Sequence, residues 1–94
     1  MAHVRMAPED RKAQILEVAY KLTRKIGFKK ATRTAIAAEA GVTPGLVGVY
    51  YPGRTTLRNA ILQAAIAHAD KKTVRNALDH GIGEGVRIPK ALRA

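Results

Sequence analysis

A short stretch of the chain, residues 36 to 54 (IAAEAGVTPGLVGVYYPGR), constrains the fold more than any other part. Its apolar residues recur at helical spacing as far as Gly41, where a glycine can take the left-handed conformation that ends many helices. Thr43 and Pro44 suit the start of a second helix, because a hydroxyl at the N-cap accepts a backbone N–H and a proline at the first helical position loses no hydrogen bond. The stretch therefore predicts a helix-turn-helix.

The residues on either side of this motif complete a predicted all-α fold, a three-helix bundle with a helix-turn-helix and a long fourth helix. Glycine and proline mark the helix boundaries, and the acidic residues after Pro8 suit the positive end of the first helix. The expected segments are a basic arm at 1–7, helices at 8–26, 33–40, 44–50 and from 54 into the low seventies or to His80, and a flexible tail at 81–94. We expect residues 8–80 to form one domain.

This arrangement resembles the N-terminal DNA-binding domain of the TetR family of transcriptional regulators, over about residues 9 to 69. The matching positions are Arg11, Lys12, Ile15, Leu16, Ala19, Gly27, Thr32, Ile36, Ala37, residues 40–43, Gly45, Tyr50, Tyr51, Arg54 and Leu57. The chain departs from the family's pattern at Gly48, where a tyrosine is usual, at Tyr51 in place of phenylalanine and at Arg54 in place of lysine. The resemblance implies a TetR-like DNA-binding domain in which Arg54 contacts a DNA phosphate.

The net charge of the chain favours a polyanionic partner. Seventeen Lys and Arg against seven Asp and Glu give +10, which suits nucleic acid or an acidic membrane surface. The chain has no cysteine, and its three histidines lack metal-ligand spacing. It has no apolar run long enough to span a bilayer and no phosphate-binding or nucleophile motif. We therefore expect no cofactor, no bound metal, no membrane partner and no enzymatic activity.

Positive charge is concentrated before and at the start of the helix-turn-helix. No acidic residue occurs from Val18 to Ala38. The basic residues of this span are Lys21, Arg24, Lys25, Lys29, Lys30 and Arg33. In a helix-turn-helix protein this region lies over the phosphate backbone of DNA. We therefore expect Lys29, Lys30 and Arg33 to contact phosphates.

The second short helix carries no charged side chain, so it lacks the arginine and carboxylate contacts with base edges that are common in the major groove. Specificity would then depend on DNA shape, on contacts with thymine methyl groups and on Arg33 or Thr34 from the start of the first short helix. The residues expected to contact DNA in this way are Thr34, Thr43, Pro44, Gly45, Leu46, Gly48, Val49 and Tyr50. Tyr51, by contrast, is expected in the core.

The helix expected after Arg54 is apolar on two opposite sides, and a helix that is apolar all round is buried all round. One side can close the three-helix core, whereas the other side needs a further partner. The residues expected at a homodimer interface on that side are Leu62, Ile66, Ala69 and Thr73. The alternative is that residues 74–92 fold back over it.

These features predict a cytoplasmic, sequence-specific repressor that binds a palindromic operator as a homodimer. About 25 residues follow the region of resemblance, too few to enclose a ligand pocket, so we expect no small-molecule ligand or inducer. The chain is then a shortened form of a larger regulator or, as we expect, a stand-alone repressor. Two other classes stay open. One is a nucleoid or architectural protein that binds DNA without sequence preference, and the other is a membrane-surface or partner-binding module that uses the apolar helix.

Overall fold

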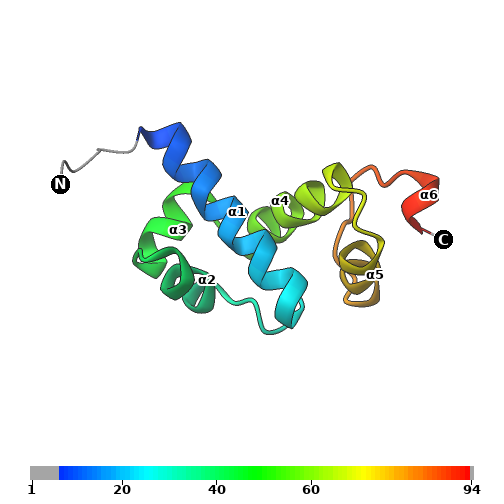
Figure 1. The fold of residues 1–94 in the computed structure, drawn as a ribbon, viewed down its shortest axis with the longest axis horizontal. Helices are drawn as coiled ribbons and strands as arrows, with labels where there is room; N and C mark the ends of the chain where they lie inside the picture. Colours follow the sequence, from blue (N-terminus) through cyan, green and yellow to red (C-terminus); the bar gives the residue numbers. More distant parts are fainter. Residues whose placement is uncertain (1–6, 94) are drawn as a thin grey trace.

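The computed structural model describes residues 7–93, and these residues form an all-α fold, which confirms the predicted fold class. The helices are α1 (Pro8–Ile26), α2 (Arg33–Ala40), α3 (Pro44–Tyr50), α4 (Arg54–Ala67), α5 (Lys71–Asp79) and α6 (Lys90–Arg93). The fold is elongated, 47 × 23 × 20 Å, with α2 and α3 towards one end and α5 and α6 towards the other (Figure 1). The basic arm expected at 1–7 lies outside the described residues, except for Ala7.

The first three helices begin and end where the sequence predicts. Helix α1 starts at Pro8 and ends before Gly27, whose φ of 86° is unfavourable for other residues. Thr32 and Thr43 cap α2 and α3, because each hydroxyl accepts the backbone N–H three residues ahead, at 3.1 and 3.2 Å. Gly41 takes the left-handed conformation, with φ 70° and ψ 31°, and ends α2. The helix-turn-helix is therefore specified by local interactions.

The apolar core joins α1 to the helix-turn-helix and to α4 and α5. The large side chains that are fully buried are Phe28, Ile15, Ile36, Ile61, Leu62, Val47 and Val74. Each such side chain stabilises the fold by roughly 1.5–3 kcal/mol through the apolar surface it removes from water. Tyr51 is also buried, as predicted, and its hydroxyl donates a hydrogen bond of 3.0 Å to the carbonyl oxygen of Lys12.

The expectation of one long helix after Arg54 is wrong, because the chain breaks between α4 and α5. Helix α4 ends at Ala67, and Ala69 has a φ of 52°, which is left-handed. Asp70 then caps α5, since its carboxylate accepts hydrogen bonds from the backbone N–H of Thr73 at 3.1 Å and from its hydroxyl at 2.6 Å. The hydroxyl of Tyr20, on α1, donates to the same carboxylate at 2.9 Å. Contacts with α1 therefore hold the break in place.

The C-terminal segment folds back over α4, which is the alternative considered above for its second apolar side. The buried apolar residues of this segment are Ile82, Ile88 and Leu92. Leu62 is 0% exposed, and an ideal Cβ built on Gly83 would lie only 2.7 Å from its Cδ2 atom. The expectation of a flexible tail is therefore wrong for the described residues 81–93, because they supply part of the core.

Two of the four residues expected at a homodimer interface are buried within one chain. Leu62 lies under the C-terminal segment, and Thr73 is 4% exposed because its hydroxyl bonds to Asp70. Ile66 is half-buried and Ala69 is exposed. The placement of Leu62 and Thr73 on an open dimer face is therefore wrong, since intramolecular packing covers both.

The packing of the C-terminal segment on α4 predicts unequal costs for two glycine substitutions. Gly83→Ala and Gly85→Ala each place a side chain at positive φ, 108° and 81°, but only Gly83→Ala also brings a Cβ against Leu62. We expect Gly83→Ala to lower the free energy of unfolding by about 1–3 kcal/mol more than Gly85→Ala. Urea denaturation measures the difference. Equal losses in the two variants would mean that the segment does not pack on Leu62.

The Asp70 cluster predicts a loss of stability in acid. Burial alone would raise the pKa of Asp70, but hydrogen bonds from Thr73 and Tyr20 and the charge of Arg24 outweigh it and hold the pKa below its usual value. A carboxylate with a lowered folded pKa contributes stability above its unfolded pKa of about 3.9. That contribution is lost as the pH falls through the folded pKa. We expect Asp70→Asn to lower the free energy of unfolding at pH 7 by about 1 kcal/mol and to reduce its dependence on pH below 4.

A second carboxylate provides the control for this prediction. Glu17 pairs with Lys21 at 2.9 Å, but both side chains are about two-thirds exposed, at 65% and 69%. We expect Glu17→Gln to change the free energy of unfolding by less than about 0.5 kcal/mol and to leave its acid dependence as in the unmodified chain. If Asp70→Asn keeps the full acid dependence when unfolding is followed from pH 3 to pH 7, Asp70 is not its source.

Candidate nucleic-acid interface

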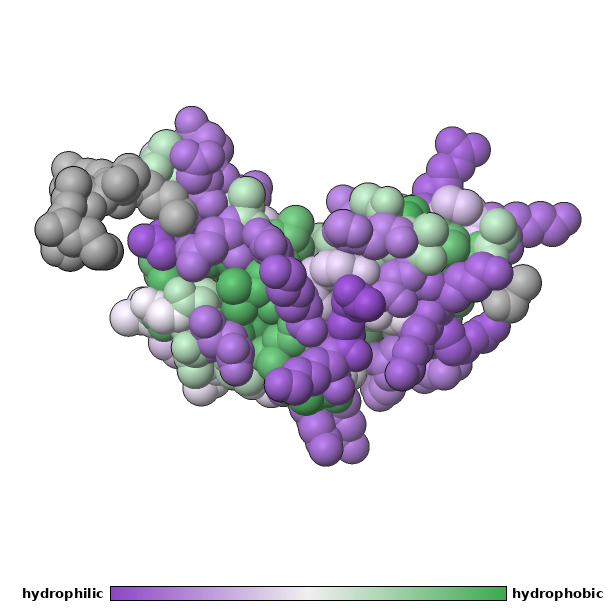
Figure 2. All heavy atoms as spheres, in the orientation of Figure 1, coloured by the Kyte–Doolittle hydropathy of each residue, from purple (hydrophilic) through white to green (hydrophobic). Residues whose placement is uncertain are grey.

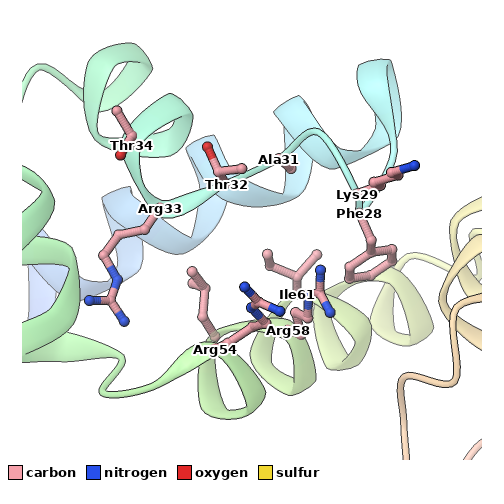
Figure 3. Close-up of a pocket in the computed structure, with 10 residues that line it drawn as sticks. Phe28, Lys29, Ala31, Thr32, Arg33, Thr34, Arg54, Arg58 and Ile61 are labelled. Carbon is pink, nitrogen blue, oxygen red and sulfur yellow. The ribbon is translucent and has the colours of Figure 1, made fainter.

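A basic pocket of about 530 Å3 lies between the start of α2 and the start of α4 (Figure 3). Its buried apolar floor consists of Phe28, Ala31, Leu57 and Ile61. Its polar rim consists of Lys29, Thr32, Arg33, Thr34, Arg54 and Arg58. The fold thus brings two separate basic segments, 29–33 and 54–58, around one opening.

These cations have no carboxylate partner in the part of the chain that the structure describes. The ion pairs found between residues 7 and 93 are Lys21 with Glu17, at 2.9 Å, and Arg24 with Asp70, at 3.3 Å. Burial, and then the charge of Arg54, lower the pKa of the Arg58 guanidinium, so these two like charges oppose each other. An anion in the pocket would relieve this repulsion. Phosphate oxygens suit the site, because they match the fork of donors on a guanidinium.

The residues expected to contact phosphates lie close to this pocket. Lys29, Arg33 and Arg54 line it, together with Thr34. Lys30 is exposed in the turn before α2 but does not line the pocket. The structure therefore groups most of the predicted cations in one place, although their contacts with DNA stay a prediction.

Sequence reasoning missed one cation of the pocket, Arg58. The spacing could have revealed it, since residues four apart share one face of a helix and Arg58 follows Arg54 by four positions. Figure 3 shows both arginines rising from the same side of α4, towards the loop that carries Phe28. Helix α4 therefore contributes two cations to the pocket.

Helix α3 presents an uncharged surface beside these cations. Val47 is fully buried, whereas Val49 is 71% exposed. Leu46 and Tyr50 are half-buried, so part of each remains accessible. The outward surface of α3 can therefore make apolar contacts, such as those with thymine methyl groups.

The start of α3 is also exposed. Thr43, Pro44 and Gly45 all reach solvent. The hydroxyl oxygen of Thr43 accepts the N–H of Leu46, so its O–H remains able to donate to an external acceptor. Gly48 is half-buried, and the guanidinium of Arg33 lies against it. The polar groups that α3 can offer a ligand are therefore few, and a neighbouring helix supplies charge to its surface.

Polar and apolar surfaces are unevenly distributed over the molecule. Figure 2 shows hydrophilic side chains over most of the visible face, with an apolar area towards the end at which α2 and α3 lie. Among residues 7–93 no helix is long and apolar enough to cross a bilayer. Within the same range, no group of three or more His, Cys, Asp or Glu side chains is placed to hold a metal ion.

Comparison with known proteins agrees with this geometry. Residues 15–61, half of the chain, match the family described as bacterial regulatory proteins of the tetR family. No curated protein and no solved structure gives a match to the chain. The matched span runs from within α1 to within α4, so it includes the whole helix-turn-helix and the whole lining of the basic pocket. The chain therefore belongs to the tetR family of bacterial regulatory proteins, which are DNA-binding regulators of transcription.

Proposed function

We propose that this chain is a sequence-specific repressor that binds a palindromic operator as a homodimer in the bacterial cytoplasm. The observation that carries the proposal is the pairing of two surfaces: the basic pocket between α2 and α4 and the exposed, uncharged surface of α3. A duplex presents phosphates and base edges side by side, so the two surfaces can meet these two parts of one ligand.

In this proposal the two surfaces have different roles in DNA binding. Cations on the rim of the pocket contact phosphates and supply affinity for any duplex. Val49, with Leu46 and Tyr50, enters the major groove and makes contacts that depend on the base sequence. Affinity and specificity then depend on different residues, which allows them to be measured separately.

The proposed homodimer follows from the small size of the reading surface. A helix of seven residues covers only a few base pairs, whereas two copies related by a two-fold axis read two half-sites about 34–36 Å apart. The contact surface between the copies cannot use Leu62 or Thr73 directly, because both are buried within one chain. Ile66 and Ala69, at the end of α4, remain accessible to a partner.

The proposal includes no small-molecule inducer. The basic pocket is assigned to DNA, and its four cations, Lys29, Arg33, Arg54 and Arg58, all belong to the proposed DNA contacts. Occupancy of the operator would then follow the concentration of the protein alone, through mass action.

A nucleoid or architectural protein without sequence preference is the second candidate function. It is favoured by the absence of charge on α3, since direct readout commonly uses arginine or carboxylate side chains. Selection of bound duplexes from a random pool separates the two functions, followed by footprinting and by sedimentation of the complex. A repressor should enrich a two-fold symmetric sequence and sediment with two chains per site. Failure to enrich any sequence would favour the architectural function.

The basic pocket predicts a strong and residue-specific dependence of binding on salt. Each phosphate that the protein neutralises contributes about 0.9 to the slope of log K against log salt concentration. We expect Arg54→Gln and Arg58→Gln each to weaken binding to random duplex DNA. Each variant should also flatten this slope by about one unit in a single chain, or about two units in a dimer, because one phosphate per chain is no longer neutralised.

The matched control removes a cation that does not line the pocket. Arg75 is exposed on α5, and its Nη2 donates to the carbonyl oxygen of Arg93 at 2.9 Å. We expect Arg75→Gln to leave the slope unchanged, when fluorescence anisotropy is recorded from low to moderate salt. If all three variants flatten the slope equally, binding reflects net charge and the pocket has no special role.

The exposed surface of α3 predicts that specificity can be lost without loss of general affinity. Truncating Val49 leaves no cavity in the core, because the side chain is 71% exposed. We expect Val49→Ala to reduce affinity for the selected operator by about 1 kcal/mol, while binding to random duplex at low salt stays nearly unchanged. Lys29→Ala should instead weaken binding to both duplexes. If Val49→Ala lowers the affinity for operator and random duplex by the same factor, α3 does not recognise the base sequence.

A further inference from the structure

Helix α3 has no charged residue of its own, but an arginine from α2 lies on its surface. An ideal Cβ built on Gly48 would be 3.3 Å from Nη1 of Arg33, 3.6 Å from Cζ and 4.0 Å from Nε. Three atoms of the planar guanidinium therefore lie within contact distance of one point on α3. Figure 3 shows the Arg33 side chain extending from the start of α2, apart from the guanidinium groups of Arg54 and Arg58.

Gly48 provides space for this contact and no unusual backbone conformation. Gly48 is not one of the glycines with a positive φ in the described chain, so alanine can adopt the same backbone conformation. Glycine is also unfavourable inside a helix compared with alanine. The other glycine of α3, Gly45, has only the hydroxyl oxygen of Thr43 near its Cβ position, at 3.9 Å. A glycine at 48 is therefore explained by the Arg33 guanidinium, whereas Gly45 has no such neighbour.

The guanidinium of Arg33 keeps its donors available for a ligand. The side-chain hydrogen bonds and ion pairs found within residues 7–93 use other arginines, on α1 and α5. Arg33 is exposed and has no resolved carboxylate partner in that range. The position next to Gly48 in the chain is Val49, which is 71% exposed. The guanidinium donors therefore lie at the surface of α3, next to Gly48.

We propose that Arg33 is the base-reading side chain of this interface and that Gly48 is the seat that holds its guanidinium on α3. The ligand would be a guanine in each half-site, because a planar fork of N–H donors matches the O6 and N7 acceptors of guanine in the major groove. The inference rests on the proposed function. It states that a residue of α2 supplies the charged side chain for base reading that α3 does not have. Arg54 and Arg58 remain the phosphate contacts of the pocket.

The test begins with the operator selected from a random pool and its single-base variants. In the unmodified protein we expect one guanine per half-site to be preferred over other bases. Arg33→Lys keeps the charge but loses the fork, and should lower this preference by about 5- to 100-fold. If Arg33→Lys instead weakens operator and random DNA equally and keeps the guanine preference, Arg33 is a phosphate contact and the inference is wrong. Selection of an operator without such a guanine would also overturn it.

The seat is tested by Gly48→Ala, alone and together with Arg33→Ala. The added Cβ would lie 3.3 Å from Nη1 and would push the guanidinium back by a few tenths of an ångström, so Gly48→Ala should reduce the guanine preference while its melting temperature stays the same or rises. In the Arg33→Ala background, Gly48→Ala should produce no further loss of preference. Equal losses in both backgrounds would show that Gly48 acts without Arg33, and that the seat does not exist.

Gly45→Ala provides the matched control on the same helix. The substitution adds the same methyl group but does not bring it near Arg33. The guanine preference should therefore persist, even if the overall affinity for DNA changes. Failure of the inference differs from failure of the proposed function. If the protein selects an operator and Arg33→Lys leaves the guanine preference unchanged, only the inference is wrong. If the protein binds no duplex at low salt, the proposed function is wrong as well.

Discussion

Burial of Phe28 in the loop between α1 and α2 is the interaction on which the functional surface depends. Its side chain is 1% exposed and forms the floor of the basic pocket with Ile61 of α4. Its backbone N–H donates to Oδ1 of Asn76, on α5, at 2.9 Å. The apolar contact fixes the start of α2 near the start of α4, and the hydrogen bond satisfies a backbone group that burial would otherwise leave unpaired. Four cations are thereby held around one opening.

Holding like charges together costs free energy, and the fold must offset that cost elsewhere. The lowered pKa of Arg58 reflects burial first and the charge of Arg54 second. Offsetting interactions lie in the C-terminal half of α1, where Asp70 accepts hydrogen bonds from α1 and α5 and pairs with Arg24 at 3.3 Å. Unpaired cations near a cleft are poor for stability and useful for binding an anion, so they indicate a functional surface.

The sequence predicts the parts of the fold that depend on neighbouring residues. Thr32, Gly41 and Thr43 set helix ends through contacts within a few positions, and all three behave as expected. The end of α4 was missed although Asp70 and Thr73 form a local N-cap for α5, whereas the added bond from Tyr20 to Asp70, fifty positions apart, could not be read from the sequence. The same limit applies to the site. Its cations could be named from the charge pattern, but their convergence on one pocket, and the contact of Arg33 with α3, depend on tertiary packing.

The dependence on Phe28 also explains how α5 matters for DNA binding without contacting DNA. Asp70 caps α5, α5 carries Asn76, and Asn76 holds the loop that places the basic residues 29–33. Loss of the cap would remove the two hydrogen bonds by which Asp70 holds the start of α5, the helix that carries Asn76. The joint between α4 and α5 and the loop that borders the pocket are therefore connected through the hydrogen bond from the Phe28 N–H to the Asn76 side chain. The helix-turn-helix has caps of its own, Thr32 and Thr43, but its buried residues Ile36 and Val47 belong to the same core as Phe28.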